Sequence, residues 1–294
     1  MTTMKLHLID GTYELYRAHF APRPGHLDAS GRDVKATVGI VASLLALLHD
    51  PGEAVTHIAV AFDNPIRSFR NDLFPYYKSD EGVPPELRSQ FDMAEDAVRA
   101  IGVTVWSMRE YEADDALASG ARRFRDQLDQ VRIMTPDKDL GQCLRGDRVV
   151  QVDRRQQKVI DEPGFRAERG FGPGSMPDFL ALAGDSADGF PGLPGFGKKT
   201  ASMLVGAYQH LENIPDDANQ WSIKLRGAPL LAKTLAEHRE DALLFRTLAT
   251  LVDTIDLGCS LNDLEFQGVP RERYERWCED RHIERLKTAP RRWQ

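Results

Sequence analysis

The sequence predicts an α/β protein with a largely parallel central sheet flanked by helices, joined to a smaller helical subdomain. Short apolar runs alternate with helix-like segments up to about residue 160, and such alternation usually builds a parallel sheet. From about residue 175 to 250, short helices broken by Gly and Pro replace the strand signal. With 294 residues and 41% hydrophobic content, the chain is long enough to bury a full core.

Local patterns define the individual elements. The predicted strands are residues 5–9, 55–62, 103–106 and 131–135, and the predicted hairpin joins 149–152 to 158–160. The predicted helices are 35–49, 84 to about 101, and about 116 to 126. We therefore expect an α/β domain over residues 1–174, a helical subdomain over 175–260 and a helical tail over 261–294.

Composition excludes several classes of protein. The longest apolar stretches are far shorter than a membrane span, and residues 1–30 lack the pattern of a signal peptide. Cys143, Cys259 and Cys278 show no paired spacing, so neither a disulfide framework nor a zinc site is predicted. We expect a cytoplasmic monomer that does not associate with membranes. The net charge of −7 decides little about nucleic acid, since acids that bind divalent cations present no negative face once loaded.

Acidic residues follow the predicted strands, where each strand ends. Taken alone, the three acids within residues 111–115 are explained by the first turn of a helix, where the macrodipole favours negative charge. However, the carboxyl ends of parallel strands meet at one edge of a sheet, and ligands bind there. The candidate metal ligands are Asp10, Asp63, Glu112, Asp114, Asp115, Asp137, Asp139, Asp185 and Asp188.

The chemistry of these candidates indicates a hard cation. Asp185 and Asp188 are spaced to share one face of a helix. Oxygen ligands without His or Cys favour Mg²⁺ or Mn²⁺ over zinc. So many carboxylates exceed the needs of one ion and suit two ions about 3.5–4 Å apart, an arrangement used in phosphodiester cleavage.

Eight segments occur in the order typical of bacterial 5′ nucleases. They are residues 8–11 (LIDG), 61–63 (AFD), 68–70 (SFR), 77–78 (YK), 111–115 (YEADD), 135–140 (TPDKDL), 184–188 (GDSAD) and 191–201 (PGLPGFGKKTA). Over residues 4–260 the chain resembles the 5′→3′ exonuclease domain of DNA polymerase I and the free-standing flap endonucleases. The resemblance implies a structure-specific nuclease acting on DNA 5′ flaps, nicks and 5′ ends in replication and repair. The length predicts a free-standing member without an attached polymerase.

The resemblance also implies how the acids are divided. Asp63, Glu112, Asp114 and Asp115 would surround a first ion, with Asp10 nearby, and Asp137, Asp139, Asp185 and Asp188 a second. Glu112 and Asp115, at i and i+3, would face the first ion, while Asp114 would be an outer or bridging ligand. The ions would activate the attacking water and stabilise charge in the transition state.

Residues 64–92 interleave basic and aromatic side chains and form a candidate gateway to the site. A solvated loop or surface helix is the alternative. The family's motif implies that Lys78 and Arg70 contact the scissile phosphate and that Tyr77 stacks on a terminal nucleotide. The chain departs from the family at Glu81, where related enzymes usually carry Arg. This acid is expected to weaken DNA binding or alter substrate preference.

The glycine-rich turn before residue 201 is predicted to be a helix–hairpin–helix. Its expected DNA-binding residues are Gly192, Gly195, Gly197, Lys198, Lys199 and Thr200. Glycines let the backbone approach phosphates, and helix N-terminal amides and lysines bind them without reading base sequence. A purely structural turn is one alternative. A Walker P-loop is another, disfavoured by Lys199 in place of Ser or Thr and by the lack of a preceding strand.

Two further expectations come from the resemblance. The hairpin is expected to hold K⁺ through backbone carbonyls. Gly189 stands where the family usually carries Asn, and this change is expected to loosen the turn that aims Asp188.

Two other functions are open. One is a branched-DNA-binding homologue with weak or absent cleavage. The other is an aspartyl-nucleophile phosphatase, but that class needs an Asp-x-Asp after the first strand, and Asp10-Gly11-Thr12 does not supply it.

Overall fold

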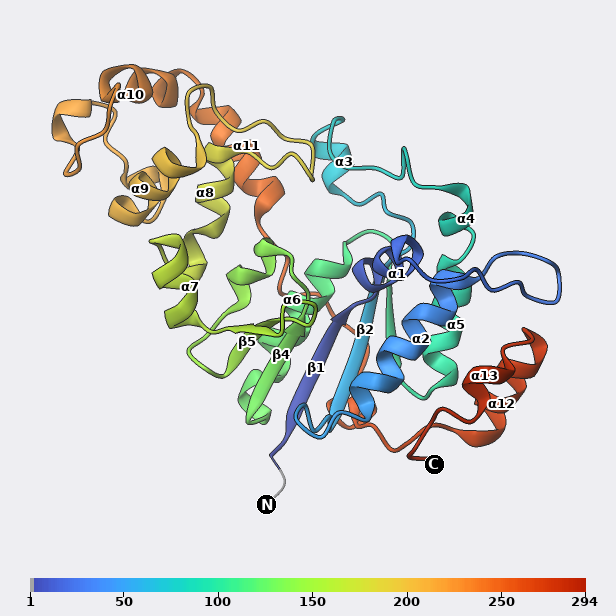
Figure 1. The fold of residues 1–294 in the computed structure, drawn as a ribbon. Helices are drawn as coiled ribbons and strands as arrows, with labels where there is room; N and C mark the ends of the chain where they lie inside the picture. Colours follow the sequence, from blue (N-terminus) through green and yellow to red (C-terminus); the bar gives the residue numbers. More distant parts are fainter. Residues whose placement is uncertain (1–2) are drawn as a thin grey trace. The chain divides into compact units, whose positions relative to one another are not determined.

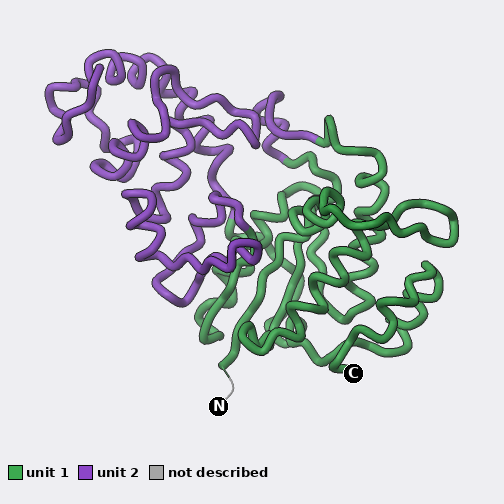
Figure 2. The backbone as a smooth tube through the Cα atoms, viewed as in Figure 1, with its two compact units in different colours: residues 1–68, 80–135, 253–294 green, residues 69–79, 136–252 purple. Residues whose placement is uncertain are grey.

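The computed structural model describes residues 3–294, which divide into two compact units (Figures 1 and 2). The first unit comprises the described residues up to Ser68, Asp80–Thr135 and Asp253–Gln294, and the second comprises Phe69–Ser79 and Pro136–Val252. From Pro136 to Val252 the chain belongs to the second unit, and the domain boundary expected near residue 174 stays a prediction. The candidate gateway is divided, because its residues 69–79 belong to the second unit.

A parallel sheet forms the centre of the first unit (Figure 1). Its strands are β1 (Lys5–Asp10), β2 (His57–Asp63), β3 (Thr104–Met108) and β4 (Gln130–Met134), in the order β3-β2-β1-β4. All seven residues of β2 are buried, as expected for a strand covered on both faces. The predicted largely parallel sheet is confirmed.

Helices cover both faces of this sheet. The helices of the first unit are α1 (Gly11–Phe20), α2 (Lys35–Leu48), α4 (Pro85–Arg88), α5 (Phe91–Ala100), α6 (Ala113–Phe124), α12 (Arg271–Asp280) and α13 (Glu284–Lys287), with 3-10 turns η1 (Arg125–Gln127) and η6 (Asn262–Leu264). α6 packs against all four strands, and α1 packs on α2 at the opposite face (Figure 1). The helix predicted from residue 84 is in fact two, α4 and α5, and α1 was not predicted.

The second unit is mainly helical and encloses its own core. Its elements are α3 (Arg70–Leu73), η2 (Lys138–Cys143), β5 (Val149–Asp153), β6 (Lys158–Ile160), α7 (Glu162–Arg169), η3 (Pro173–Ser175), α8 (Met176–Ala183), α9 (Lys198–Tyr208), η4 (Leu211–Asn213), η5 (Ala218–Gln220), α10 (Ala228–Glu237) and α11 (Arg239–Ala249). β5 and β6 pair antiparallel as the predicted hairpin. Phe190 stacks on Phe245 within the core, their ring centroids 5.7 Å apart. Within residues 3–294, no helix is long and apolar enough to cross a bilayer.

Candidate metal and nucleic-acid site

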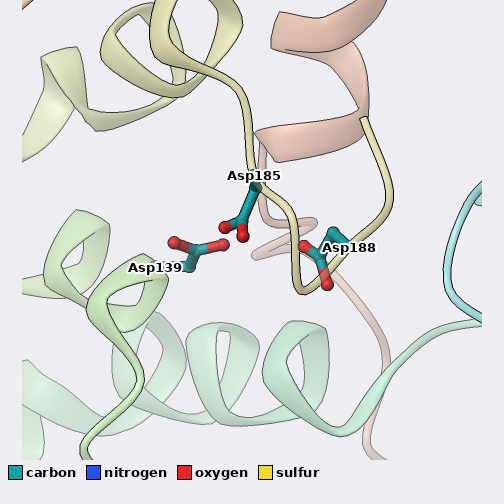
Figure 3. A group of neighbouring side chains, drawn as sticks. All are labelled: Asp139, Asp185 and Asp188. Atoms are coloured by element: carbon teal, nitrogen blue, oxygen red, sulfur yellow. The ribbon is translucent and has the colours of Figure 1, made fainter. Parts of the chain in front are cut away.

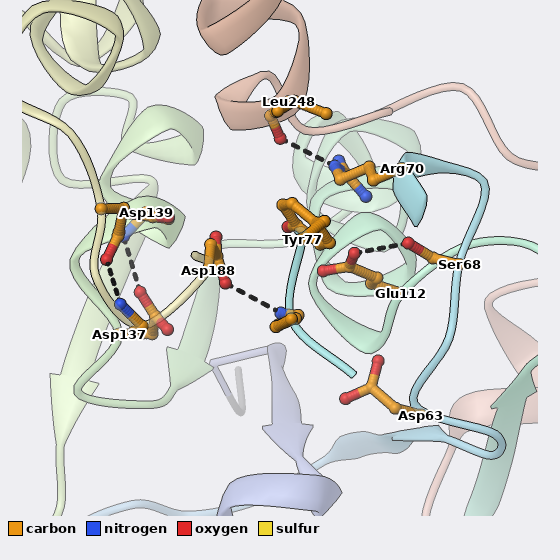
Figure 4. A network of polar contacts seen from close by, with 12 residues as sticks. Asp63, Ser68, Arg70, Tyr77, Glu112, Asp137, Asp139, Asp188 and Leu248 are labelled. Carbon is orange, nitrogen blue, oxygen red and sulfur yellow. Dashed lines mark hydrogen bonds and ion pairs between the residues drawn. The ribbon is translucent and has the colours of Figure 1, made fainter. Parts of the chain in front are cut away.

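Three of the predicted metal ligands meet in the second unit. Carboxylate oxygens of Asp139, Asp185 and Asp188 all lie within 4.8 Å of one another (Figure 3). Asp139 belongs to η2, and the other two belong to the loop that follows α8. The fourth predicted member, Asp137, caps η2 and accepts a hydrogen bond from the Asp139 amide at 2.9 Å (Figure 4). The structure therefore gathers the acids assigned to the second ion.

Asp139 and Asp185 are the most buried members of this cluster, since each is only 6% exposed. Asp139 Oδ1 has no hydrogen-bond partner within the described residues, and the Lys138 ammonium lies 3.4 Å from it. Burial, followed by repulsion from Asp137, raises the pKa of the Asp139 carboxyl to about 8, and Lys138 opposes this rise. Such a carboxylate favours a further cation beside it.

Two lysines balance part of the charge of the cluster. Lys138 forms ion pairs with Asp185 and Asp139. The Lys78 ammonium lies 3.3 Å from Asp188 Oδ1, and the Lys78 amide donates to the Asp188 carbonyl at 3.0 Å. The family resemblance implies that Lys78 contacts a phosphate, whereas Lys138 was not predicted to be a site residue. Its position between Asp137 and Asp139 was the available signal.

A short bridged turn, rather than a helix, presents Asp185 and Asp188. The Asp185 amide donates to the Phe190 carbonyl at 2.9 Å, and the Phe190 amide returns the bond at 3.1 Å. Asp185 Oδ1 also accepts from the Ala187 amide at 3.0 Å. The expectation of a shared helical face is therefore wrong. The turn brings the two acids together by closing the chain on itself.

In the first unit, Asp10 and Asp63 are the last residues of neighbouring parallel strands. Asp10 caps α1 by accepting from the Tyr13 amide at 2.8 Å, and its other oxygen accepts from the Thr135 hydroxyl at 2.9 Å. Asp63 accepts from the Ala113 amide at 2.7 Å. Parallel pairing therefore places both acids at the carboxyl edge of the sheet, as predicted.

The acidic stretch after β3 forms the start of α6. Glu112 is the N-cap, and its amide donates to Asp115 Oδ2 at 3.0 Å, which with the reverse contact makes a capping box. Glu112 Oε1 also accepts from the Ser68 hydroxyl at 2.7 Å (Figure 4). Asp115 is fully buried and Asp114 half-buried. The helix-start interpretation thus holds, and the metal-ligand roles of these acids stay predictions.

The predicted gateway residues differ sharply in exposure. Arg70 is 1% exposed, and its Nε and an Nη donate to the carbonyls of Leu248 and Thr250 at 2.8 and 2.9 Å (Figure 4). Tyr77 is 4% exposed and belongs to the core of the second unit, whereas Tyr76 is 79% exposed. Phosphate contact by Arg70 and base stacking by Tyr77 stay predictions. Of these two tyrosine rings, that of Tyr76 is the accessible one.

The glycine-rich turn connects α8 to α9, as a helix–hairpin–helix requires. Gly192 has φ of +70°, and a Cβ there would lie 2.3 Å from the Gly184 nitrogen, so only glycine fits. Gly197 caps α9, and Lys198 and Lys199 are exposed in its first turn. Of the remaining predicted residues, Gly195 has φ of +83° and Thr200 is half-buried. Phosphate binding here stays a prediction, and the preceding helix is inconsistent with a P-loop.

Two family models match successive parts of the chain. Residues 5–170 match the family model "5′-3′ exonuclease, N-terminal resolvase-like domain", and residues 171–272 match "5′-3′ exonuclease, C-terminal SAM fold". DNA polymerase I of Bacillus caldotenax is 34% identical over 275 residues, and that of Pseudomonas aeruginosa is 33% identical over 280 residues. Each alignment covers 92% of this chain and 30% of the relative. The chain thus spans about a third of the length of these curated relatives.

Solved structures share the fold at low sequence identity. The bacteriophage T5 D15 protein, crystallised with metal ions, matches with a TM-score of 0.66 and 16% identity over 97% of this chain and 100% of that one. The catalytic core of Rad2 in complex with DNA substrate matches with a TM-score of 0.60 and 15% identity, covering 95% and 88%. Together with the two family models, these similarities confirm the resemblance drawn from the motifs. The chain belongs to the 5′-3′ exonuclease family.

Proposed function

We propose that this chain is a divalent-metal-dependent 5′ nuclease that hydrolyses DNA phosphodiester bonds at 5′ ends and 5′ flaps. The observation that carries the proposal is the cluster of Asp139, Asp185 and Asp188, with oxygens within 4.8 Å of one another. Membership of the exonuclease family supplies the reaction class. To this reaction class we add the DNA substrate and the dependence on a divalent metal.

The residues of the cluster fit a hard cation. All its members are carboxylates, without His or Cys, and this donor set suits Mg²⁺ or Mn²⁺. Asp139 Oδ1 is buried and lacks a hydrogen bond within residues 3–294. The two lysines carry two positive charges against four acids if Asp137 is counted. With all four carboxyl groups ionised, two negative charges remain, which a divalent ion would balance.

We assign the first set of acids to another ion. Asp10, Asp63, Glu112, Asp114 and Asp115 are its proposed ligands. Buried hydrogen bonds from backbone amides fix Asp63 and Asp115 in the first unit, so these carboxylates need little reorganisation to bind a cation. When bound, Mg²⁺ or Mn²⁺ supplies an acidified water and stabilises charge on the phosphate oxygens.

The chain's own cations act on the substrate. The Lys78 side chain is 25% exposed, and its ammonium forms an ion pair with Asp188 Oδ1 at 3.3 Å. We propose that this ammonium binds a scissile phosphate oxygen when DNA is bound. Stabilising developing charge by a fixed ammonium is a common source of rate enhancement.

The hairpin supplies the DNA contact that does not depend on sequence. Lys198 and Lys199 lie exposed at the N-terminus of α9, where free amides also favour a phosphate. Glycines at 195 and 197 leave the backbone open to a close approach. We extend this assignment to K⁺ coordination by hairpin carbonyls, which the family resemblance implies.

A cleavage assay tests the proposal. The protein is incubated with a 5′-labelled flap duplex and Mg²⁺, Mn²⁺ or EDTA, alongside Lys78→Ala and Asp115→Ala variants. We expect wild type to release 5′ products with either metal and neither variant to do so at a comparable rate. If wild type binds the duplex but releases no 5′ product with either metal, the chain is a branched-DNA-binding protein and the nuclease proposal is wrong.

A further inference from the structure

The loop that carries Asp188 and the segment that carries Lys78 touch through their backbones. The Lys78 amide donates to the Asp188 carbonyl at 3.0 Å, and the two side chains form an ion pair of 3.3 Å. All of these atoms belong to the second unit. The placement of the candidate phosphate-binding lysine is therefore tied to the loop of a candidate metal ligand.

Gly189, the next residue, makes this approach possible. A Cβ on Gly189 would lie 2.3 Å from the Tyr76 carbonyl oxygen and 3.6 Å from the Lys78 nitrogen. Its φ of +85° is in the left-handed region, which glycine adopts without steric cost. The Tyr76 oxygen is a backbone atom, so no change of rotamer could relieve the clash.

A second hydrogen bond fixes the Lys78 backbone through its carbonyl. The Asn71 side-chain amide donates to the Lys78 carbonyl at 2.9 Å and to the Tyr77 carbonyl at 3.3 Å. The Tyr77 ring is buried in the core of the unit. The Lys78 backbone therefore lies between the Asp188 loop and Asn71, with its neighbour anchored in the core.

We propose that Gly189 is a positioning residue for the nuclease reaction. By lacking a side chain, it lets the Asp188 loop close on residues 76–78 and fixes the Lys78 backbone, from which the ammonium reaches Asp188. The inference rests on the proposed function, because it gives Lys78 its catalytic task. It also revises the expected loosening at this position, because glycine here permits a close contact rather than removing one.

The test compares Gly189→Ala with Gly227→Ala. Gly227 has a similar φ of +76°, lies in the same unit, and a Cβ there meets nothing within 4 Å. Both variants thus carry the backbone strain of a left-handed alanine, and only the first adds the clash. Thermal unfolding establishes that both are folded.

Two measurements report on the position of Lys78. Hydrogen exchange at the Lys78 amide, measured without metal or DNA, should be faster in Gly189→Ala and unchanged in Gly227→Ala. The single-turnover rate of 5′-flap cleavage, measured with the enzyme in saturating excess over the DNA, should fall in Gly189→Ala by on the order of 100-fold, as for a misplaced catalytic group. The affinities for DNA and for Mn²⁺ should be retained, because the hydrogen bonds between Asp185 and Phe190 hold the acidic turn independently.

The outcomes separate the inference from the proposed function. Unchanged Lys78 exchange in Gly189→Ala, or cleavage as fast as that of Gly227→Ala, would overturn the positioning role. Should Gly189→Ala fail to fold, Asn71→Ala releases Lys78 from its other side without a clash and should show the same two effects. Should wild type not cleave, the nuclease proposal fails, while the exchange measurement still decides whether Gly189 fixes the Lys78 backbone.

Discussion

The side-chain carboxyl group of Asp139 is buried. Its neighbour Asp137 repels it, and the ammonium of Lys138 is shared with Asp185. Removing an ion from water costs several kcal/mol unless nearby opposite charges compensate. Lys138 compensates the charge of Asp139 only in part, because it also pairs with Asp185. A divalent cation is the compensation that we propose.

Replacing Asp139 tests this residue directly. Asp139→Asn keeps the size of the side chain but removes its charge, so Mn²⁺ affinity measured by calorimetry should fall by at least the roughly 10–100-fold that loss of an outer-shell partner typically costs. Asp217→Asn is the control, since Asp217 is an exposed N-cap in the same unit. Equal affinity in the two variants would contradict the assignment of Asp139 as a ligand.

A partly buried cluster in the first unit makes stability depend on pH. Glu53 accepts from His7 and forms two contacts with Arg132, and the His7 bond followed by Arg132 lowers the Glu53 pKa to about 2. The folded pKa is below the unfolded one, so the stabilisation is complete above pH 4.5 and is lost as pH falls towards 2. Glu53→Gln should flatten this part of the pH dependence of urea unfolding. A profile identical to wild type would contradict it.

His7 acts in the same direction at higher pH. Burial lowers its pKa below 6.5, so the imidazole is neutral in the fold and donates from Nε2 to Glu53. Its neutral form stabilises the fold above pH 6.5, and this contribution is lost as pH falls through the folded pKa. As pH falls, the loss therefore begins near pH 6.5 for His7 and near pH 4.5 for Glu53.

Among the elements, α8 carries the polar anchor of the helical unit. Asp178 in its first turn is 2% exposed and accepts from the Leu211 amide at 3.0 Å, His210 Nδ1 at 2.9 Å and Arg246 at 3.2 Å. It thereby ties α8 to η4 and α11. No sequence pattern indicates this role, because a lone acid near a helix start is ordinary.

Asp178→Ala should destabilise the protein by about 3 kcal/mol, since it leaves buried donors unpaired. Urea unfolding of this variant and of Asp178→Asn provides the measurement. The amide keeps an acceptor for the Leu211 amide, so it should recover part of the loss. If Asp178→Ala unfolds at the wild-type midpoint, Asp178 is not an anchor.

The hairpin before α9 gives a prediction about DNA binding. If Lys198 neutralises one phosphate, Lys198→Ala should reduce the slope of log affinity against log salt by about 0.9. Lys233→Ala is the control, since Lys233 is an exposed lysine of α10 in the same unit that pairs with Glu237. An equal slope in both variants would argue against a phosphate contact by Lys198.

The elements also show why sequence patterns predicted some features and missed others. Continuous apolar runs identified β1 and β2, because a buried parallel strand has no polar face. α1 escaped because its sequence, GTYELYRAHF, has little apolar periodicity and buries even Glu14. Tyr76 and Tyr77 are identical by type, and only packing in the core decides which ring is exposed.

At the scale of the whole molecule, chain order did not predict the compact units. Residues 69–79 join the second unit although 80–135 return to the first. Such a division depends on contacts between distant parts of the chain, such as Arg70 with Leu248, for which local periodicity holds no signal. The strand-end acids were predictable because parallel pairing alone brings Asp10 and Asp63 to one edge.

The central claim is that the chain cleaves DNA with a cation held by the acidic cluster. Its most direct test is the single-turnover rate of 5′-flap cleavage by wild type and Asp185→Asn across a Mn²⁺ titration. We predict that wild type reaches a metal-saturated rate. Asp185→Asn should cleave more slowly by on the order of 100-fold or more, even at saturating metal, while binding the duplex with unchanged affinity. Cleavage by Asp185→Asn at the wild-type rate and metal midpoint would contradict the claim.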